Sequence, residues 1–302
     1  MEYVLRTFNL SKKYKNKLAV NKACMNIEKG EIYGFVGANG SGKTTLIRLI
    51  SGLIFPHMGE FELFGVNSRS PEIVKARKKL GAIVESPSIY RNMSAYDNLK
   101  MQCTLLGTDE SLIDSVLCEV GLSDMRNEKK HAGDFSLGMR QRLGIAMALL
   151  SDPMFLILDE PMNGLDPAGI VSIRELILRL NREKGITFLI SSHMLSELAL
   201  VATKYGIISE GTVIEEITAE ELRRRCGMTV SIASDTADTL YTELCRILPA
   251  EQLSYIPDGV KITGDIVLND VLSALIDAGV NLTSINCSKM SFEEYYLSKI
   301  RG

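Results

Sequence analysis

The chain has 302 residues, of which 46% are hydrophobic and 24% are charged. This composition is typical of globular proteins and excludes a fibrous or largely disordered chain. At about 150 residues per domain, the length predicts two domains. The formal net charge is only −3, so we expect neither a nucleic-acid partner nor a general attraction to acidic membrane surfaces.

The sequence contains no apolar run of the roughly 18 residues that span a bilayer, and its first residues lack the apolar region of a signal peptide. We therefore expect a protein that stays in the cytoplasm. The six cysteines are scattered and form no CxxC pair, so free thiols are expected.

Alternating polar and apolar residues predict half-exposed strands at 3–8 and 18–27. A buried strand at 31–37 then leads into a glycine-rich turn and an apolar helix at 43–54. In chain order we next expect a strand at 59–65, a charged helix from Pro71, a strand at 80–86, helices between 94 and 133, a helix at 137–150, a strand at 154–160, a helix at 169–185 and a strand at 187–193. Apolar strands separated by helices predict an α/β domain with a covered parallel sheet and a helical insertion, over residues 1 to about 217.

Residues 218–302 have a different pattern. A charged helix at 219–227 precedes the order strand, helix, strand, strand, helix, strand, and a last helix lies at 291–300. This order predicts a small α+β, ferredoxin-like accessory domain. Its residues offer no cluster of charges or ligands, so a role in packing or dimer contact is favoured over the alternative, a small-ligand sensor.

The sequence GANGSGKTT at 37–45 has the spacing of a phosphate-binding loop. Glycines let the backbone N–H groups converge on a phosphate, and the following helix points the positive end of its dipole at the same anion. Lys43 adds a positive charge near the β- and γ-phosphates, and the Thr44 hydroxyl reaches Mg²⁺. The predicted nucleotide contacts are Gly37, Asn39, Gly40, Ser41, Gly42, Lys43, Thr44 and Thr45.

Two carboxylates, Asp159 and Glu160, follow the apolar run FLIL and are expected at the carboxyl end of a buried strand. Adjacent carboxylates in such a place favour a bound cation. Asp159 would hold Mg²⁺ through water, and Glu160 would polarise the attacking water. The alternative is an ordinary solvated strand end, which the nearby phosphate loop disfavours.

The segment FSLGMRQR at 135–142 resembles the signature motif of ATP-binding-cassette (ABC) ATPases, which is usually LSGGQ. Ser136 and Gly138 match that motif, whereas Leu137 and Met139 replace a glycine and a glutamine.

Other markers of that family are Tyr14, where an aromatic residue stacks on adenine, His193 after LISS, and Asp166 in a GLDP loop, which is expected at the nucleotide. The resemblance covers residues 1 to about 217. It implies a P-loop NTPase core with a β-subdomain and a helical subdomain at about 87–150.

By this resemblance two copies of the chain pair head to tail and enclose two ATP molecules with Mg²⁺. Ser136 and the helix that begins near Gly138 then contact the γ-phosphate across the dimer interface, and His193 holds that phosphate and aligns Glu160 with the water. Tyr14 lies in the basic segment KKYKNK, so the alternative for it is a solvated side chain.

Glu85 stands where the family usually has glutamine, at the end of a strand. A carboxylate here would bind Mg²⁺ more strongly and repel the γ-phosphate, so Glu85 is expected both as a metal ligand and as a residue that affects catalysis and coupling. The alternative is a side chain that points to solvent. Glu85, the LGMRQR signature and the C-terminal extension resemble the ATPases of exporters that protect bacteria from lantibiotics and bacitracin-like peptides.

These observations imply the ATP-hydrolysing subunit of a peptide exporter, peripheral on the inner face of the membrane and bound to separate permease subunits. The permeases are expected to dock in a groove between the helical insertion and the core, next to Glu85. The alternative is a soluble ABC ATPase with a regulatory role.

Overall fold

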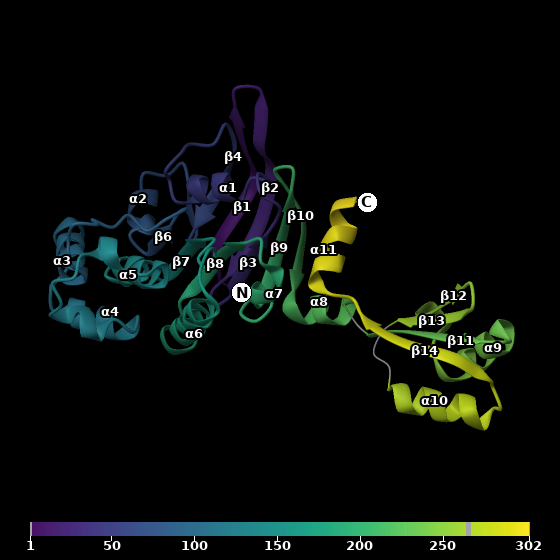
Figure 1. Ribbon diagram of the computed structural model, residues 1–302. Helices are drawn as coiled ribbons and strands as arrows, with labels where there is room; N and C mark the ends of the chain where they lie inside the picture. Colours follow the sequence, from purple (N-terminus) through teal and green to yellow (C-terminus); the bar gives the residue numbers. More distant parts are fainter. Residues whose placement is uncertain (1, 227, 264–266, 302) are drawn as a thin grey trace. The chain divides into compact units, whose positions relative to one another are not determined.

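The computed structural model describes residues 2–226, 228–263 and 267–301. The chain forms two compact units, Met1–Ile217 and Thr218–Gly302 (Figure 1). Each unit has its own hydrophobic core. Within the described ranges, no helix is both long enough and apolar enough to cross a bilayer.

A six-stranded sheet with the strand order β10-β9-β3-β8-β7-β6 forms the larger sheet of the first unit. Its strands are β3 (Ile32–Val36), β6 (Leu80–Ile83), β7 (Phe155–Asp159), β8 (Thr187–Ser192), β9 (Lys204–Ser209) and β10 (Thr212–Thr218). Neighbouring strands from β9 through β6 are parallel. Strands β3, β7 and β8 are buried along their whole length, as a parallel sheet covered on both faces requires. The parallel sheet predicted from the sequence is confirmed.

A second, antiparallel sheet has the order β2-β1-β4-β5. Its strands are β1 (Tyr3–Tyr14), β2 (Lys17–Glu28), β4 (Met58–Leu63) and β5 (Val66–Asn67). Inward side chains such as Leu5 and Met25 pack in one apolar core with Leu46 of helix α1 (Lys43–Ile50) and Phe35 of the parallel sheet. Helix α1, which follows the phosphate loop, is thus held between two sheets.

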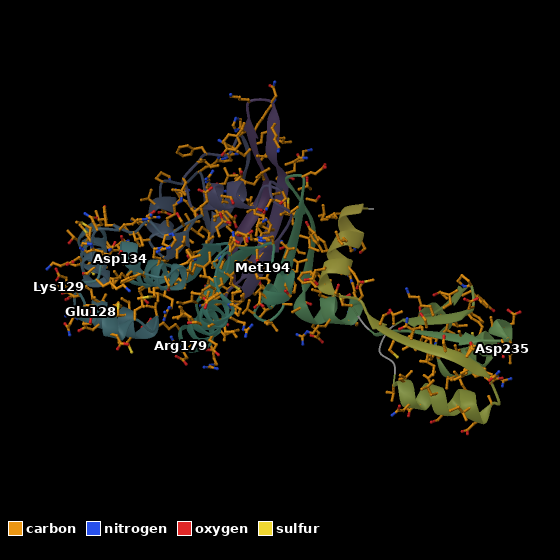
Figure 2. The ribbon with its side chains drawn as sticks, in the orientation of Figure 1. Glu128, Lys129, Asp134, Arg179, Met194 and Asp235 are labelled. Carbon is orange, nitrogen blue, oxygen red and sulfur yellow. The ribbon has the colours of Figure 1, made fainter. Side chains whose placement is uncertain are left out.

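The remaining helices of this unit are α2 (Ile73–Arg77), α3 (Ala95–Leu106), α4 (Leu112–Glu119), α5 (Leu137–Leu149), α6 (Pro167–Lys184) and α7 (Leu195–Leu198), with 3-10 turns at Ser123–Arg126 and Ala132–Asp134. Helix α3 begins at a capping box formed by Ser94 and Asp97, which satisfies backbone donors at its first turn. Helices α3, α4 and α5 contact one another and form the helical insertion. Glu128 and Lys129 lie at its outer end (Figure 2).

The second unit contains a four-stranded antiparallel sheet with the order β12-β13-β11-β14. Its elements are α8 (Ala219–Arg225), β11 (Met228–Ser234), α9 (Ala237–Ile247), a 3-10 turn (Ala250–Gln252), β12 (Leu253–Ile256), β13 (Gly259–Thr263), α10 (Leu268–Asp277), β14 (Leu282–Lys289) and α11 (Phe292–Arg301). Helices α9 and α10 cover one face of the sheet through Leu240, Leu244 and Leu275. The chain order and strand order are those of a ferredoxin-like fold.

Three segments differ from the expectation. Helix α1 ends at Ile50 rather than residue 54, because Gly52 adopts φ +78°, a conformation that ends helices. The charged helix α2 has only five residues. Residues 195–218, which the sequence pattern left unassigned, form α7, β9 and β10.

Candidate nucleotide-binding site

The phosphate loop connects β3 to α1 and has a conformation that depends on its glycines. A Cβ on Gly37 would lie 2.5 Å from Ser41 Oγ and 2.6 Å from the Ile208 carbonyl oxygen. Gly42 has φ +110°, and a Cβ there would lie 2.4 Å from the Ala19 carbonyl oxygen. Only glycine fits either position without a backbone shift. The loop is therefore built to keep its backbone close to a ligand.

Helix α1 begins in a way that leaves its first turn available to an anion. Its N-cap, Gly42, has no side chain to cap the helix, and its first turn contains no acidic residue. The Ser41 hydroxyl is buried without a hydrogen-bond partner among the described residues. Unpaired N–H groups, the helix dipole and this hydroxyl fit a bound phosphate.

Lys43 is almost fully buried, with 6% of its side chain exposed. Its ammonium donates hydrogen bonds to the Gly37 carbonyl at 2.6 Å and the Ala38 carbonyl at 3.3 Å, and it lies 3.4 Å from Glu160 Oε1. A buried ammonium needs such partners. They hold the positive charge at the mouth of the loop.

Asp159 and Glu160 occupy the end of β7, as predicted. Asp159 is 2% exposed and accepts a hydrogen bond from the Ser191 hydroxyl of β8. That same hydroxyl accepts a hydrogen bond from the Glu160 backbone N–H at 2.9 Å, and the Ser191 carbonyl accepts a second one at 3.1 Å. Ser191 therefore positions both acidic residues.

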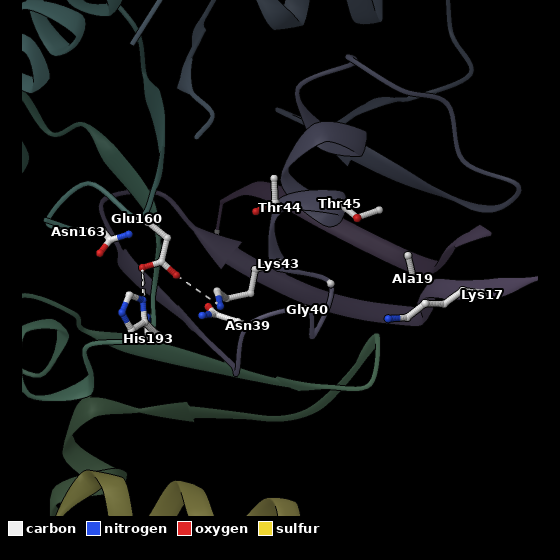
Figure 3. A pocket seen from close by; sticks show the side chains of 11 residues that line it. Lys17, Ala19, Asn39, Gly40, Lys43, Thr44, Thr45, Glu160, Asn163 and His193 are labelled. Carbon is white, nitrogen blue, oxygen red and sulfur yellow. Dashed lines mark hydrogen bonds and ion pairs between the residues drawn. The ribbon is translucent and has the colours of Figure 1, made fainter. Parts of the chain in front are cut away.

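His193 follows β8 and contacts Glu160. Its Nδ1 lies 2.7 Å from Glu160 Oε2, and its backbone N–H donates to the same oxygen at 3.3 Å. Glu160 thus lies between Lys43 and His193 (Figure 3). The sheet order explains the meeting, because β3, β8 and β7 are neighbours and their carboxyl ends share one edge.

A cavity of about 490 Å³ opens at this edge. It is lined by Lys17, Ala19, Asn39, Gly40, Gly42, Lys43, Thr44, Thr45, Glu160, Asn163 and His193. Gly37, Ser41 and Asp159 are buried beside these residues. Lys17, Ala19 and Asn163 were not predicted from the sequence. The position of Asn163, three residues after Glu160 in a loop, is a signal that could have identified it.

Mg²⁺ bound to a triphosphate takes only one or two protein ligands besides phosphate oxygens and water. Among the described residues no group of three His, Cys, Asp or Glu side chains could hold a metal ion alone. Thr44 in the cavity and Asp159 beside it offer a hydroxyl and a carboxylate. This pair fits a metal ion that binds together with the nucleotide, and it does not fit a metal ion held by protein ligands alone.

Other predicted site residues are not among the described residues that line the cavity: Tyr14, Glu85, Ser136, Gly138 and Asp166. Tyr14 is paired across the β1–β2 ladder with Lys17, which does line it. Ser136 and Asp166 cap helices, accepting hydrogen bonds from the Met139 and Gly169 N–H groups. Gly138 is partly buried on the first turn of α5, next to exposed Ser136 and Leu137.

Glu85 does not line this cavity. Its side chain is 63% exposed and forms an ion pair with Arg48 of α1 at 2.6 Å. Its backbone has φ +64°, which is uncommon for a residue with a Cβ. In this conformation the carboxylate contacts a cation of the chain itself and not the cavity that Thr44 lines.

Comparisons with known proteins agree with this geometry. The sequence model of the ABC transporter family matches residues 20–163. The bacitracin transport ATP-binding protein BcrA of Bacillus licheniformis is 38% identical, over 100% of this chain and 99% of its own length. The lantibiotic transport ATP-binding protein SrtF of Streptococcus pyogenes is 43% identical, over 70% of this chain and 90% of its own.

Among solved structures, cbiO1 of Clostridium perfringens, part of the ABC transporter complex cbiONQ, superimposes with a TM-score of 0.67. It is 28% identical and covers 74% of this chain and 91% of its own. The similarity therefore includes the three-dimensional fold as well as the motifs.

Proposed function

Because this chain belongs to the family of ABC transporter ATP-binding proteins and is an ABC-type ATPase, we propose that it drives an exporter through separate membrane permeases. The observation that carries the proposal is the convergence of Lys43, Glu160 and His193 on one cavity beside the phosphate loop. A cation, a carboxylate and an imidazole within contact distance are the groups that phosphate binding and water activation need.

In the proposed mechanism, Lys43 and the first-turn N–H groups of α1 bind the β- and γ-phosphates of ATP. Thr44 and Asp159 hold Mg²⁺, which neutralises phosphate charge when bound. The triphosphate draws the Lys43 ammonium away from Glu160, whose carboxylate is then free to accept a proton from the attacking water. His193 keeps that carboxylate oriented through its contact at Nδ1.

We further propose that two copies complete the site. Helix α5 begins at exposed Ser136 and exposed Leu137, and neither residue lines the cavity of its own chain. The Ser136 side chain already caps this helix, so its first turn is formed. In a head-to-tail homodimer, this N-terminus would meet the γ-phosphate bound to the other copy.

The permeases are proposed to dock on the first unit at a groove of about 410 Å³. The groove lies between α3 and α5 of the helical insertion and strand β6, and Val84 and Ser86 on either side of Glu85 line it. ATP-driven closure of the dimer would move the docked permease segments. The chain would thus be held at the inner face of the membrane by its partners.

The cargo is proposed to be an antimicrobial peptide, because full-length relatives are named for bacitracin transport and others for lantibiotic transport. The second unit, residues 218–302, is proposed to serve packing or dimer contact. Among its described residues no cluster of His, Cys, Asp and Glu suggests a metal ligand.

The test is reconstitution of the chain with the multi-span proteins encoded beside it, in lipid nanodiscs. ATPase activity should rise when bacitracin or a lantibiotic is added, and Glu160→Gln should abolish that response. If the chain forms no complex with those proteins, and its ATPase activity is the same with and without them, the exporter role is wrong. A regulatory role would then replace it.

A further inference from the structure

The turn of the β1–β2 hairpin and the loop between α1 and β4 form one exposed surface, which we call the basic tip and which consists of residues 12–18 and 53–58. The Lys12 ammonium donates a hydrogen bond to the Phe55 carbonyl at 2.7 Å. Directly after the loop, β4 pairs with β1. The two segments are therefore held side by side, and the hairpin projects from the first unit (purple in Figure 1).

The basic tip carries positive charge and no acidic residue. Residues 9–22 contain five lysines, and neither that segment nor residues 51–59 contain Asp or Glu. Lys13 and Lys15 are exposed, whereas Glu60, the first acid of β4, is already in an ion pair. The net charge of −3 for the whole chain conceals this local excess of positive charge, which attracts an anionic surface.

Large apolar side chains are exposed beside these lysines. Phe55 is 81% exposed and Met58 is 68% exposed. Leu18 is 44% exposed and stands opposite Lys13 in the β1–β2 ladder. A single exposed apolar residue is ordinary, but a group of them among lysines is typical of surfaces that lie in the membrane interface. There the apolar side chains enter the headgroup region while the ammonium groups contact lipid phosphates.

We propose that the basic tip binds anionic phospholipids of the membrane directly, in a contact separate from that with any permease. Lysine is a flexible point charge that suits a surface of mobile phosphates, whereas recognition of one fixed carboxylate favours arginine, which residues 9–22 and 51–59 lack. A projecting tip also fits a flat surface. This inference goes beyond the proposed function, because the chain would bind the membrane without its permease.

The experiment measures sedimentation of the full chain, without permease, with vesicles of phosphatidylglycerol and with vesicles of phosphatidylcholine. The wild type should bind the anionic vesicles more tightly, and salt should weaken that binding. Lys13→Glu combined with Lys15→Glu should weaken it about tenfold or more at low salt. Phe55→Ser combined with Met58→Ser should weaken it several-fold at low and high salt alike, because salt does not screen the burial of apolar surface.

Two control variants match these changes elsewhere in the chain. Lys129→Glu combined with Lys261→Glu reverses two other exposed lysines, and Leu200→Ser removes another apolar side chain, which is 57% exposed. Both controls should bind the anionic vesicles as the wild type does. Binding of a fluorescent nucleotide verifies that every variant is folded, since none of the changed residues is among those that line the nucleotide cavity.

Equal binding of the wild type to both kinds of vesicle, or equal binding by the tip variants and the controls, would overturn the inference. The exporter role would stand, because peptide-stimulated ATPase activity tests it separately. If the tip variants bind anionic vesicles as the wild type does but lose affinity for permease in phosphatidylcholine nanodiscs, the basic tip is a permease contact and the inference is wrong.

Discussion

At the residue scale, Glu160 has an uncommon backbone conformation. Its φ is +52°, a region that residues with a Cβ occupy only when their surroundings hold them there. Two hydrogen bonds from Glu160 N–H to Ser191 provide that constraint. The conformation directs the carboxylate toward Lys43 and His193 and away from the axis of β7.

Glu160→Gln tests this carboxylate directly. ATP binding should be retained, because the phosphate contacts come from the loop, whereas turnover should fall about 10²–10⁴-fold through loss of the general base. Equilibrium binding of a fluorescent nucleotide and steady-state phosphate release measure the two effects. Hydrolysis at the wild-type rate would exclude Glu160 from the mechanism.

Ser191→Ala should disturb both acidic residues at once. The change leaves Asp159 without its hydroxyl donor and removes one acceptor of Glu160 N–H, at a cost of about 1–3 kcal/mol in unfolding free energy. The Mg²⁺ concentration needed for half-maximal ATPase activity should rise several-fold. Ser192→Ala is the control, because its hydroxyl accepts a hydrogen bond from Met194 N–H and contacts neither acidic residue among those that the structure describes. Equal metal dependence in the two variants would contradict the role given to Ser191.

Glu85→Gln should alter peptide transport more than basal ATP hydrolysis. Glu85 is paired with Arg48 outside the nucleotide cavity and adjoins the docking groove. Peptide transport across the membrane of proteoliposomes and basal ATPase activity of the same preparation provide the comparison. An equal loss of both activities would place Glu85 in the chemical step and not in coupling.

At the scale of elements, the apolar strands β3, β7 and β8 were predictable, whereas β9 and β10 at one side of the sheet were not assigned from the sequence. β3, β7 and β8 are buried throughout, so composition alone identifies them. β10 has a partly exposed pattern, and Glu215 and Glu216 interrupt its alternation of polar and apolar residues. Glu216 nevertheless lies inside a network, accepting hydrogen bonds from Tyr33 at 2.8 Å and from the Asn26 N–H at 3.0 Å.

The Tyr33 phenol makes the stability of this edge depend on pH. Burial, together with the charge of Glu216, raises the pKa of Tyr33 well above its ordinary value. The phenol therefore stays protonated in the folded state while it ionises in the unfolded state. The stability that this group contributes is present below pH about 10 and is lost as the pH rises further toward the folded-state pKa.

Tyr33→Phe should cost about 1.5–3 kcal/mol at neutral pH, since it removes a hydrogen bond to a charged group. Above pH about 10 the variant should lose less stability than the wild type for each unit of pH. Urea denaturation at pH 7, 10 and 11 measures both effects. If the free energy of unfolding falls equally with pH in the wild type and the variant, Tyr33 does not cause the alkaline sensitivity.

The site itself was predictable only in part, because some of its contacts depend on which strands are neighbours in the fold. Lys43, Asp159 and Glu160 belong to short motifs whose spacing is set by one loop or one strand end. The role of Ser191 depends on the register in which β8 pairs with β7. The place of Lys17 depends on a hairpin from the other sheet. Contacts of this kind arise from tertiary packing, which local sequence does not encode.

At the scale of the whole molecule, two separate apolar cores predict two unfolding events. Residues of the first core come from both sheets of the first unit, and those of the second come from the ferredoxin-like sheet with α9 and α10. Differential scanning calorimetry of the full chain should show two transitions. ATP with Mg²⁺ should raise only the one that belongs to residues 1–217, because a ligand stabilises the unit that binds it. A single transition that shifts as a whole would contradict independent cores.

The strand order of the second unit also makes its sheet easy to remove or replace by protein engineering. The first and last strands, β11 and β14, are neighbours, so Met228 is opposite Lys289 in the ladder. Helices α8 and α11 meet just outside, where Arg225 donates to the Tyr295 hydroxyl at 2.9 Å. The chain thus enters and leaves this four-stranded sheet at neighbouring positions. An engineer could excise this sheet and bridge Cys226 to Ser291 with a few glycines, or graft a reporter there, while α8 and α11 keep their mutual contact.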